Sequence, residues 1–143
     1  MTESEELFLL DTNILVYAYD KDEIEKSKKA EELLAKCFLG EFNLAISNQN
    51  LAEFVYVTTR KSKLTLEQAM VNVRDISKSK TFRKINYNDG TVLSAIEIAK
   101  EFKTSFWDSL LAATMRENGI FNIYTENVND FRIPWIKAVN PMK

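Results

Sequence analysis

The stretch 7-LFLLDTNILVYAY-19 decides the fold of this chain, because an apolar run from Leu7 stops at Asp11 and a second apolar run follows directly. The first run is typical of a short buried strand. Aspartate is a favoured N-cap residue, so a helix is expected to begin just after Asp11. In an open α/β sheet the carboxyl ends of the strands form the ligand crevice. The stretch therefore predicts a strand that delivers one acid to a functional edge.

Beyond this stretch the chain alternates between helix-like and strand-like patterns. Further strands are predicted at residues 43–47, 81–87, 121–124 and 136–139, and helices at residues 23–38, 49–60, 106–118 and onward from Thr65 and from Asn88. Strands that alternate with helices favour a parallel sheet covered on both faces. With 143 residues and no repeat or linker, the sequence predicts a single α/β domain over residues 1–143.

Apolar side chains with helical spacing indicate which faces are buried. The helix after Thr65 places on one face Leu66, Ala69, Met70 and Val73. The helix after Asn88 is expected to bury Val92, Ala95, Ile96 and Ala99. Four large aromatic residues are expected mainly to pack in the core, with a protein interface as the alternative: Phe54, Tyr56, Trp107 and Trp135.

The composition is that of a globular protein, with 45% apolar and 28% charged residues. No apolar run reaches the ~18 residues that cross a membrane. The segment Met1–Glu6 is acidic and lacks the basic flank of a signal peptide. The single cysteine, Cys37, cannot form an internal disulfide. We therefore expect a cytoplasmic protein without a membrane partner.

The sequence contains no histidine, which narrows the chemistry considerably. Histidine-based nucleases, Ser-His-Asp hydrolases and histidine-rich zinc sites are excluded. One cysteine cannot build a thiolate zinc cluster either. Any catalysis must use carboxylates, hydroxyls, lysines or a hard metal ion held by oxygen atoms.

Three acids lie at junctions between predicted elements: Asp11, Glu53 and Asp108. Because parallel strands end at one edge of a sheet, side chains that follow different strands can converge there. Converging carboxylates repel unless a cation lies among them, and all-oxygen ligands favour Mg²⁺ or Mn²⁺. Such a site suits the hydrolysis of a phosphodiester by a metal-bound water.

Each acid also has a purely structural alternative. Asp11 can cap the helix that follows it. Asn50 with Glu53, and Ser105 with Asp108, have the spacing of a capping box, in which an acid complements the helix dipole.

Four segments resemble, in order, the motifs of PIN-domain ribonucleases: LLDTNILVYAYD, SNQNLAEFVYV, FWDSLLAATM and YTENVNDF. The resemblance spans about Leu7 to Phe131 and is greatest to the VapC-like toxins of toxin–antitoxin pairs. It implies a metal-dependent endoribonuclease with a three-layer α/β/α sandwich around a parallel sheet of about five strands. It also implies a homodimer and a small antitoxin that blocks the acidic pocket.

The resemblance also implies a role for individual residues. Asp11, Glu53 and Asp108 match the three acids that hold Mg²⁺ or Mn²⁺ and the attacking water. Asn127 falls where the family often has a fourth acid, so it is a candidate neutral ligand and the number of metal ions, one or two, stays open. The positions expected to support the site are Thr12, Asn13, Thr125, Asn127 and Asp130.

The segment from Arg60 to Lys84 has a net charge of +6, with eight basic residues and two acids, although the whole chain has a net charge of −2. A local basic surface attracts polyanions. The residues expected to hold the RNA backbone are Arg60, Lys80, Arg83 and Lys84. The alternative is a solvated pair of helices and their loop.

Two other functions fit the same residues. In a phosphatase or receiver-like domain Asp11 would become phosphorylated, but Asn13 departs from the Asp-x-Asp pattern of one such class. In a catalytically inactive PIN-like scaffold the chain would only bind RNA or protein. Asn127 mildly favours the scaffold, and the presence of all three acids argues against it.

Overall fold

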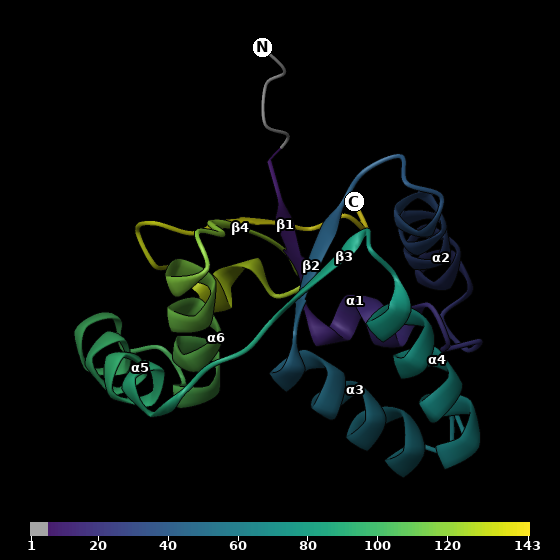
Figure 1. The fold of residues 1–143 in the computed structure, drawn as a ribbon, viewed down its shortest axis with the longest axis horizontal. Coiled ribbons are helices and arrows are strands. Elements are labelled where there is room, and N and C mark those ends of the chain that lie inside the picture. The colour runs from purple at the N-terminus through teal and green to yellow at the C-terminus, as the bar shows by residue number, and fades with distance from the viewer. Residues whose placement is uncertain (1–5) are drawn as a thin grey trace.

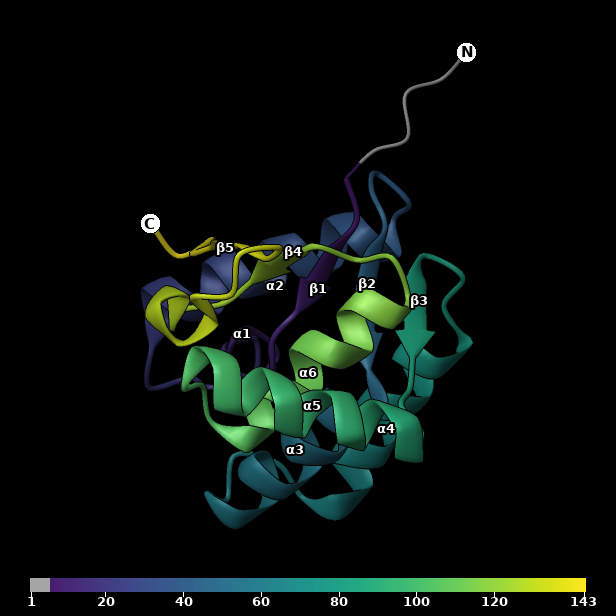
Figure 2. The same ribbon diagram turned by 90° about the vertical axis from the view of Figure 1, so that its left-hand side faces the viewer.

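The computed structural model describes residues 6–143, and in this range the strands form one parallel sheet in the order β3-β2-β1-β4-β5 (Figures 1 and 2). The strands are β1 (Phe8–Leu10), β2 (Leu44–Ser47), β3 (Phe82–Ile85), β4 (Asn122–Tyr124) and β5 (Lys137–Val139). This confirms the predicted parallel sheet. Of the segment considered for a signal peptide, residues 1–5 lie outside the described residues.

Helices cover both faces of the sheet. They are α1 (Thr12–Tyr17), α2 (Ile24–Phe38), α3 (Asn48–Arg60), α4 (Leu66–Lys78), α5 (Asp89–Phe102) and α6 (Phe106–Glu117), with a short 3₁₀ helix η1 (Val128–Phe131). Helices α1 to α4 lie on one side of the sheet, and α5 and α6 lie on the other (Figure 1). The predicted three-layer α/β/α sandwich is therefore confirmed. Within residues 6–143 none of these helices has the length and apolar character needed to cross a membrane.

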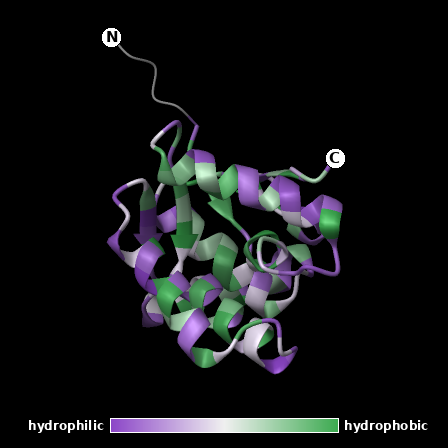
Figure 3. Ribbon diagram, turned by 90° about the vertical axis from the view of Figure 1, so that its right-hand side faces the viewer, coloured by the Kyte–Doolittle hydropathy of each residue, from purple (hydrophilic) through white to green (hydrophobic). Residues whose placement is uncertain are grey.

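The central strand β1 is buried on both faces, which explains its continuous apolar sequence. Successive side chains of a strand point to opposite sides. Leu10 packs with the side chains of α1 to α4, whereas Leu9 packs with α6 through Leu111 and Met115. Figure 3 shows hydrophobic residues along the strands and a mixture of hydrophobic and hydrophilic residues along the surrounding helices.

Helices α1 and α3, which follow β1 and β2, each begin at a polar N-cap residue. Asp11 caps α1, because its Oδ1 accepts the backbone N–H of Thr12 at 2.8 Å. At α3 the capping box is formed by Ser47 and Asn50, not by the predicted pair of Asn50 and Glu53. The helix starts three residues earlier than that pair requires, so Glu53 lies inside it. Glu53 therefore does not cap this helix.

The predicted buried stripe of α5 is wrong at Ile96, which is exposed, and the helix instead buries Thr91, Ala95 and Ile98. Leu93 and Ile98 are also apolar, so the spacing of apolar residues alone could not predict which face of the helix is buried. On α4 the predicted apolar face is only partly covered: Ala69 is buried but Leu66 and Met70 are exposed.

The expectation that the aromatic residues are mainly core is right for Phe54, which is fully buried. It is wrong for Tyr56 and Trp107, which are 61% and 60% exposed. Trp135 is partly buried and makes an edge contact with Phe102.

Candidate active site

A cavity of about 320 Å³ opens at the carboxyl ends of the strands. It is lined by Asp11, Thr12, Asn13, Val16, Tyr17, Asp20, Glu53, Val57, Lys61, Asp108 and Asn127. The three acids singled out in the sequence thus lie around the same space, although they come from the start of α1, the middle of α3 and the start of α6. Parallel pairing of β1 with β2 places the starts of α1 and α3 at the same edge of the sheet, whereas α6 reaches this edge after α5.

Asp11 is the most constrained acid of the cavity. Its Oδ1 accepts the Thr12 backbone N–H, and its Oδ2 accepts the Thr125 hydroxyl at 2.8 Å. Burial raises the pKa of Asp11 to about 6, against the opposing effect of these two hydrogen bonds. The negative charges of Asp108 and Glu53 raise this pKa further. Without a cation, the ionised form of Asp11 is therefore costly.

Glu53 is held by donors on both of its carboxylate oxygens. Oε1 accepts from Gln49 Nε2 at 3.1 Å, and Oε2 accepts from the Thr12 hydroxyl at 3.3 Å. The Thr12 oxygen in turn accepts from Asn50 Nδ2 at 3.0 Å. A continuous chain of hydrogen bonds therefore links the capping box of α3 to this carboxylate.

Asp108 lies in the first turn of α6, whose N-cap residue is Ser105. The Ser105 hydroxyl accepts the Asp108 backbone N–H at 3.2 Å and lies 2.9 Å from Asp108 Oδ2, to which it can donate. Burial raises the pKa of Asp108, Ser105 lowers it, and the charges of Asp130 and Glu53 raise it again. The predicted capping box of Ser105 and Asp108 is thus formed in one direction only: Ser105 caps α6, and the Asp108 carboxylate faces the acidic cavity.

The donor atoms of the cavity fit a hard divalent cation by type. They are carboxylate, amide and hydroxyl oxygens, which Mg²⁺ and Mn²⁺ prefer. In residues 6–143, however, no three acid or cysteine side chains lie close enough to form a ready metal cluster. Asp108 and Glu53 instead hydrogen-bond to Ser105 and Gln49. The carboxylates of Asp11, Glu53 and Asp108 would have to move closer together to share one cation.

The supporting residues differ in how closely they approach the cavity. Thr12, Asn13 and Asn127 line it. Thr125 is buried behind it and acts on Asp11 through its hydroxyl. Asp130 lies on η1 outside the lining and reaches Asp108 only through its charge.

Among the polar lining residues, Tyr17 and Asp20 were not predicted from the sequence, whereas Lys61 belongs to the predicted basic segment from Arg60 to Lys84. The signal for the first two was present, since Asn13, Val16, Tyr17 and Asp20 have the spacing of one helical face. Asp20 pairs with Lys63 at 3.0 Å, and this contact lowers its pKa.

Most of the predicted RNA-binding residues are not beside the cavity. Lys80 precedes β3 at the amino end of the parallel sheet, and Arg83 is exposed on the same edge strand. The Lys84 ammonium turns to the carbonyls at the end of α4, at Ile76 and Ser79. Arg60 ends α3 and stacks on Tyr56. Among the described residues, the basic side chain in the lining is Lys61.

Fold and site together define an α/β protein with a carboxylate-rich cavity at the edge of a parallel sheet. The PIN domain family matches residues 8–133, and the chain belongs to this family. No curated protein sequence matches it significantly.

Several solved structures share the fold. VapC20 from Mycobacterium tuberculosis, described as a sarcin–ricin loop cleaving toxin, is 21% identical with a TM-score of 0.67, over 86% of this chain and 92% of that chain. A toxin–antitoxin complex from Klebsiella pneumoniae is 22% identical with a TM-score of 0.65, over 94% and 97%. VapBC2 from Rickettsia felis, bound to promoter DNA, is 24% identical with a TM-score of 0.65, over 94% and 98%.

The raised pKa of Asp11 predicts how stability depends on pH in the presence of a chelator. The folded protein keeps the Asp11 proton up to a pKa of about 6, whereas the ordinary value is 3.8. The contribution of Asp11 to the free energy of unfolding therefore falls as pH rises from about 4 to about 6, by at most about 3 kcal/mol. Asn is also a good N-cap. Urea unfolding should show Asp11→Asn gaining on the wild type across this window, and a difference independent of pH would contradict the prediction.

Proposed function

We propose that this protein is a metal-dependent endoribonuclease that hydrolyses RNA phosphodiester bonds, and that it is the toxin of a toxin–antitoxin pair. The observation that carries the proposal is the meeting of Asp11, Glu53 and Asp108 from three separate helices around one cavity. Membership of the PIN domain family supports it. We infer a single catalytic domain in the cytoplasm.

The residues of the cavity divide the work between them. The carboxylates of Asp11, Glu53 and Asp108, with the amide oxygen of Asn127, would hold Mg²⁺ or Mn²⁺. The bound ion would supply an activated water and neutralise charge on the phosphodiester. Thr125 orients Asp11 through its hydroxyl, and Thr12 orients Glu53. Burial first, and then the charges of neighbouring acids, raise the pKa values of Asp11 and Asp108; a cation in this cavity would offset both effects, which favours its binding.

Two protein partners belong to the proposal: an antitoxin that covers the acidic cavity and a second copy of the chain. Several of the structures with this fold are toxin–antitoxin complexes. This chain also has an apolar groove of about 630 Å³ on α3 and α4, in which Leu66 and Met70 are exposed and Val55 and Val73 are partly buried. Exposed apolar surface of this kind marks protein interaction sites.

The inactive scaffold is the second candidate, because one observation favours it. The three acids are hydrogen-bonded to neighbours and do not already form a metal cluster within residues 6–143. A phosphorylated Asp11 fits less well, since both of its oxygens already accept hydrogen bonds.

Cleavage of RNA separates the enzyme from the scaffold. We expect the wild type to cut structured RNA with Mg²⁺ or Mn²⁺ and to stop in chelator. Asp11→Asn should lose at least about tenfold in rate, because the loss of a metal ligand should cost no less than the loss of a residue that only orients one. Asp22→Asn is the matched control, since this exposed acid lies outside the cavity lining. If the wild type and Asp11→Asn are equally inert over a range of both metals, the scaffold is the correct function.

The basic residue at the cavity predicts where RNA phosphates bind. Binding is measured with Asp11→Asn protein, whose cleavage of the RNA should be impaired. In this background Lys61→Glu should weaken RNA binding at low salt, because it removes a positive charge from the cavity. Joint charge reversal of Lys80, Arg83 and Lys84 is the comparison, and we expect a smaller effect from it despite its larger change in charge. Filter binding over a salt series measures both. A larger effect of the triple variant would instead make Lys80, Arg83 and Lys84 the RNA site.

A further inference from the structure

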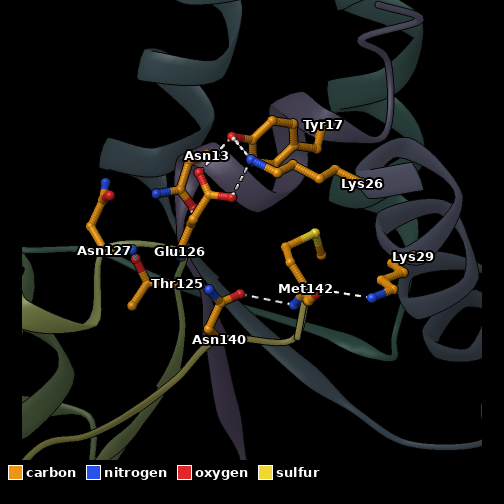
Figure 4. A network of polar contacts seen from close by, with 9 residues as sticks. All are labelled: Asn13, Tyr17, Lys26, Lys29, Thr125, Glu126, Asn127, Asn140 and Met142. Carbon is orange, nitrogen blue, oxygen red and sulfur yellow. Dashed lines mark hydrogen bonds and ion pairs between the residues drawn. The ribbon is translucent and has the colours of Figure 1, made fainter. Parts of the chain in front are cut away.

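Three polar side chains beside the cavity form a closed set of contacts that the proposed chemistry does not use (Figure 4). The Tyr17 hydroxyl donates to Glu126 Oε1 at 2.6 Å, and Lys26 Nζ lies 2.8 Å from Glu126 Oε2. Lys26 also donates to the Tyr17 oxygen at 3.3 Å and lies 5.0 Å from the centre of its ring. We call these three residues the Glu126 clasp. It joins α1, α2 and the loop that follows β4.

The clasp holds Glu126, and the residues on either side of Glu126 both contribute to the cavity. On one side, the Thr125 hydroxyl donates to Asp11. On the other side, Asn127 lines the cavity, and its backbone N–H donates to the Thr125 hydroxyl oxygen at 3.1 Å. The Glu126 backbone N–H donates to Asn13 Oδ1 at 3.4 Å. The direction of the Glu126 side chain therefore bears on the position of both neighbours.

The charge of Glu126 gives the clasp a second consequence. Glu126 adds a carboxylate, paired with Lys26, next to a cavity that is already lined by the acids Asp11, Glu53 and Asp108. The clasp directs its carboxylate toward α2 and balances it with an ammonium group. The two charged side chains are 37% and 27% exposed, and ion pairs that solvent can reach contribute little to stability. A role in positioning explains the arrangement better than a role in stability.

We propose that Tyr17, Lys26 and Glu126 position the loop of Thr125 to Asn127 over the candidate active site. The clasp keeps the Thr125 hydroxyl on Asp11 and the Asn127 amide at the cavity, and it withholds the Glu126 carboxylate from the metal ligands. Lys26 is thus a positioning residue, acting on the cavity only through Glu126. The proposal rests on the proposed function, in which this cavity binds Mg²⁺ or Mn²⁺.

The test compares Lys26→Met with Lys26→Arg, which can keep the ion pair, and with Lys21→Met. The last is the matched control, because it breaks an exposed pair of Lys21 with Glu31, whose side chains are 78% and 50% exposed. Tyr17→Phe provides a second variant, since it removes one hydrogen bond of the clasp and leaves the charges in place. Three quantities are measured: Mn²⁺ affinity by calorimetry, kcat and KM for RNA, and the exchange rates of the Glu126 and Asn127 amides by NMR.

We expect Lys26→Met to weaken Mn²⁺ binding about tenfold, as loss of a residue that orients a ligand does. Its kcat at fixed Mn²⁺ should fall, its KM for RNA should stay unchanged, and both amides should exchange faster. Lys26→Arg should recover all three values, Tyr17→Phe should show a smaller change in the same direction, and Lys21→Met should match the wild type. A purely structural ion pair would not separate kcat from KM in this way.

Equal Mn²⁺ affinity, kcat and amide exchange in Lys26→Met and Lys21→Met would overturn the proposal. Amide exchange also separates it from the proposed function, because it requires neither metal nor RNA. If the wild type binds no Mn²⁺ and cuts no RNA, the nuclease function fails. Faster exchange in Lys26→Met would then still support the holding of the loop, and unchanged exchange would reject the clasp as well.

Discussion

Parallel pairing of β1 with β2 and β4 is the constraint on which the rest of the structure depends. The pairing aligns Leu10 with Tyr124, and the Asp11 backbone N–H donates to the Tyr124 carbonyl at 3.0 Å. The next residue on each strand, Asp11 and Thr125, can therefore meet through their side chains. On the other side, β2 ends at Ser47, which caps the helix that carries Glu53. This edge of the sheet thus positions Asp11 and the helix that carries Glu53, while α6 supplies Asp108 together with its partner Ser105.

The same edge concentrates negative charge, and the surrounding residues moderate it. Ser105, Thr12 and Thr125 donate to the three acids, but burial and mutual repulsion still raise the pKa values of Asp11 and Asp108. Such a site lowers the stability of the metal-free fold, as functional sites often do. Lys26 pairs with Glu126, so the charge of this nearby acid is balanced and does not lower the stability further. Local electrostatics therefore favour the binding of a cation in this cavity.

Much of the fold could be predicted from the sequence, because its signals are local. The apolar run that ends at Asp11, the cap residues and the alternation of strands and helices each involve few adjacent residues. The rotation of α5 could not be predicted, since Leu93, Ile96 and Ile98 are all apolar and only packing selects Ile98. The clasp joins residues 109 positions apart, so no local pattern indicates it. Net charge along the chain predicted a basic segment but not that Lys80 lies at the opposite end of the sheet.

The central claim is that side chains from α1, α3 and α6 bind one divalent cation. A crystal soaked in Mn²⁺ and measured for anomalous scattering tests it most directly. The account predicts a peak among the oxygen atoms of Asp11, Glu53 and Asp108, and loss of this peak in Asp11→Asn crystals. A soaked crystal with no peak there, and with Glu53 and Asp108 still bonded to Gln49 and Ser105, would contradict it.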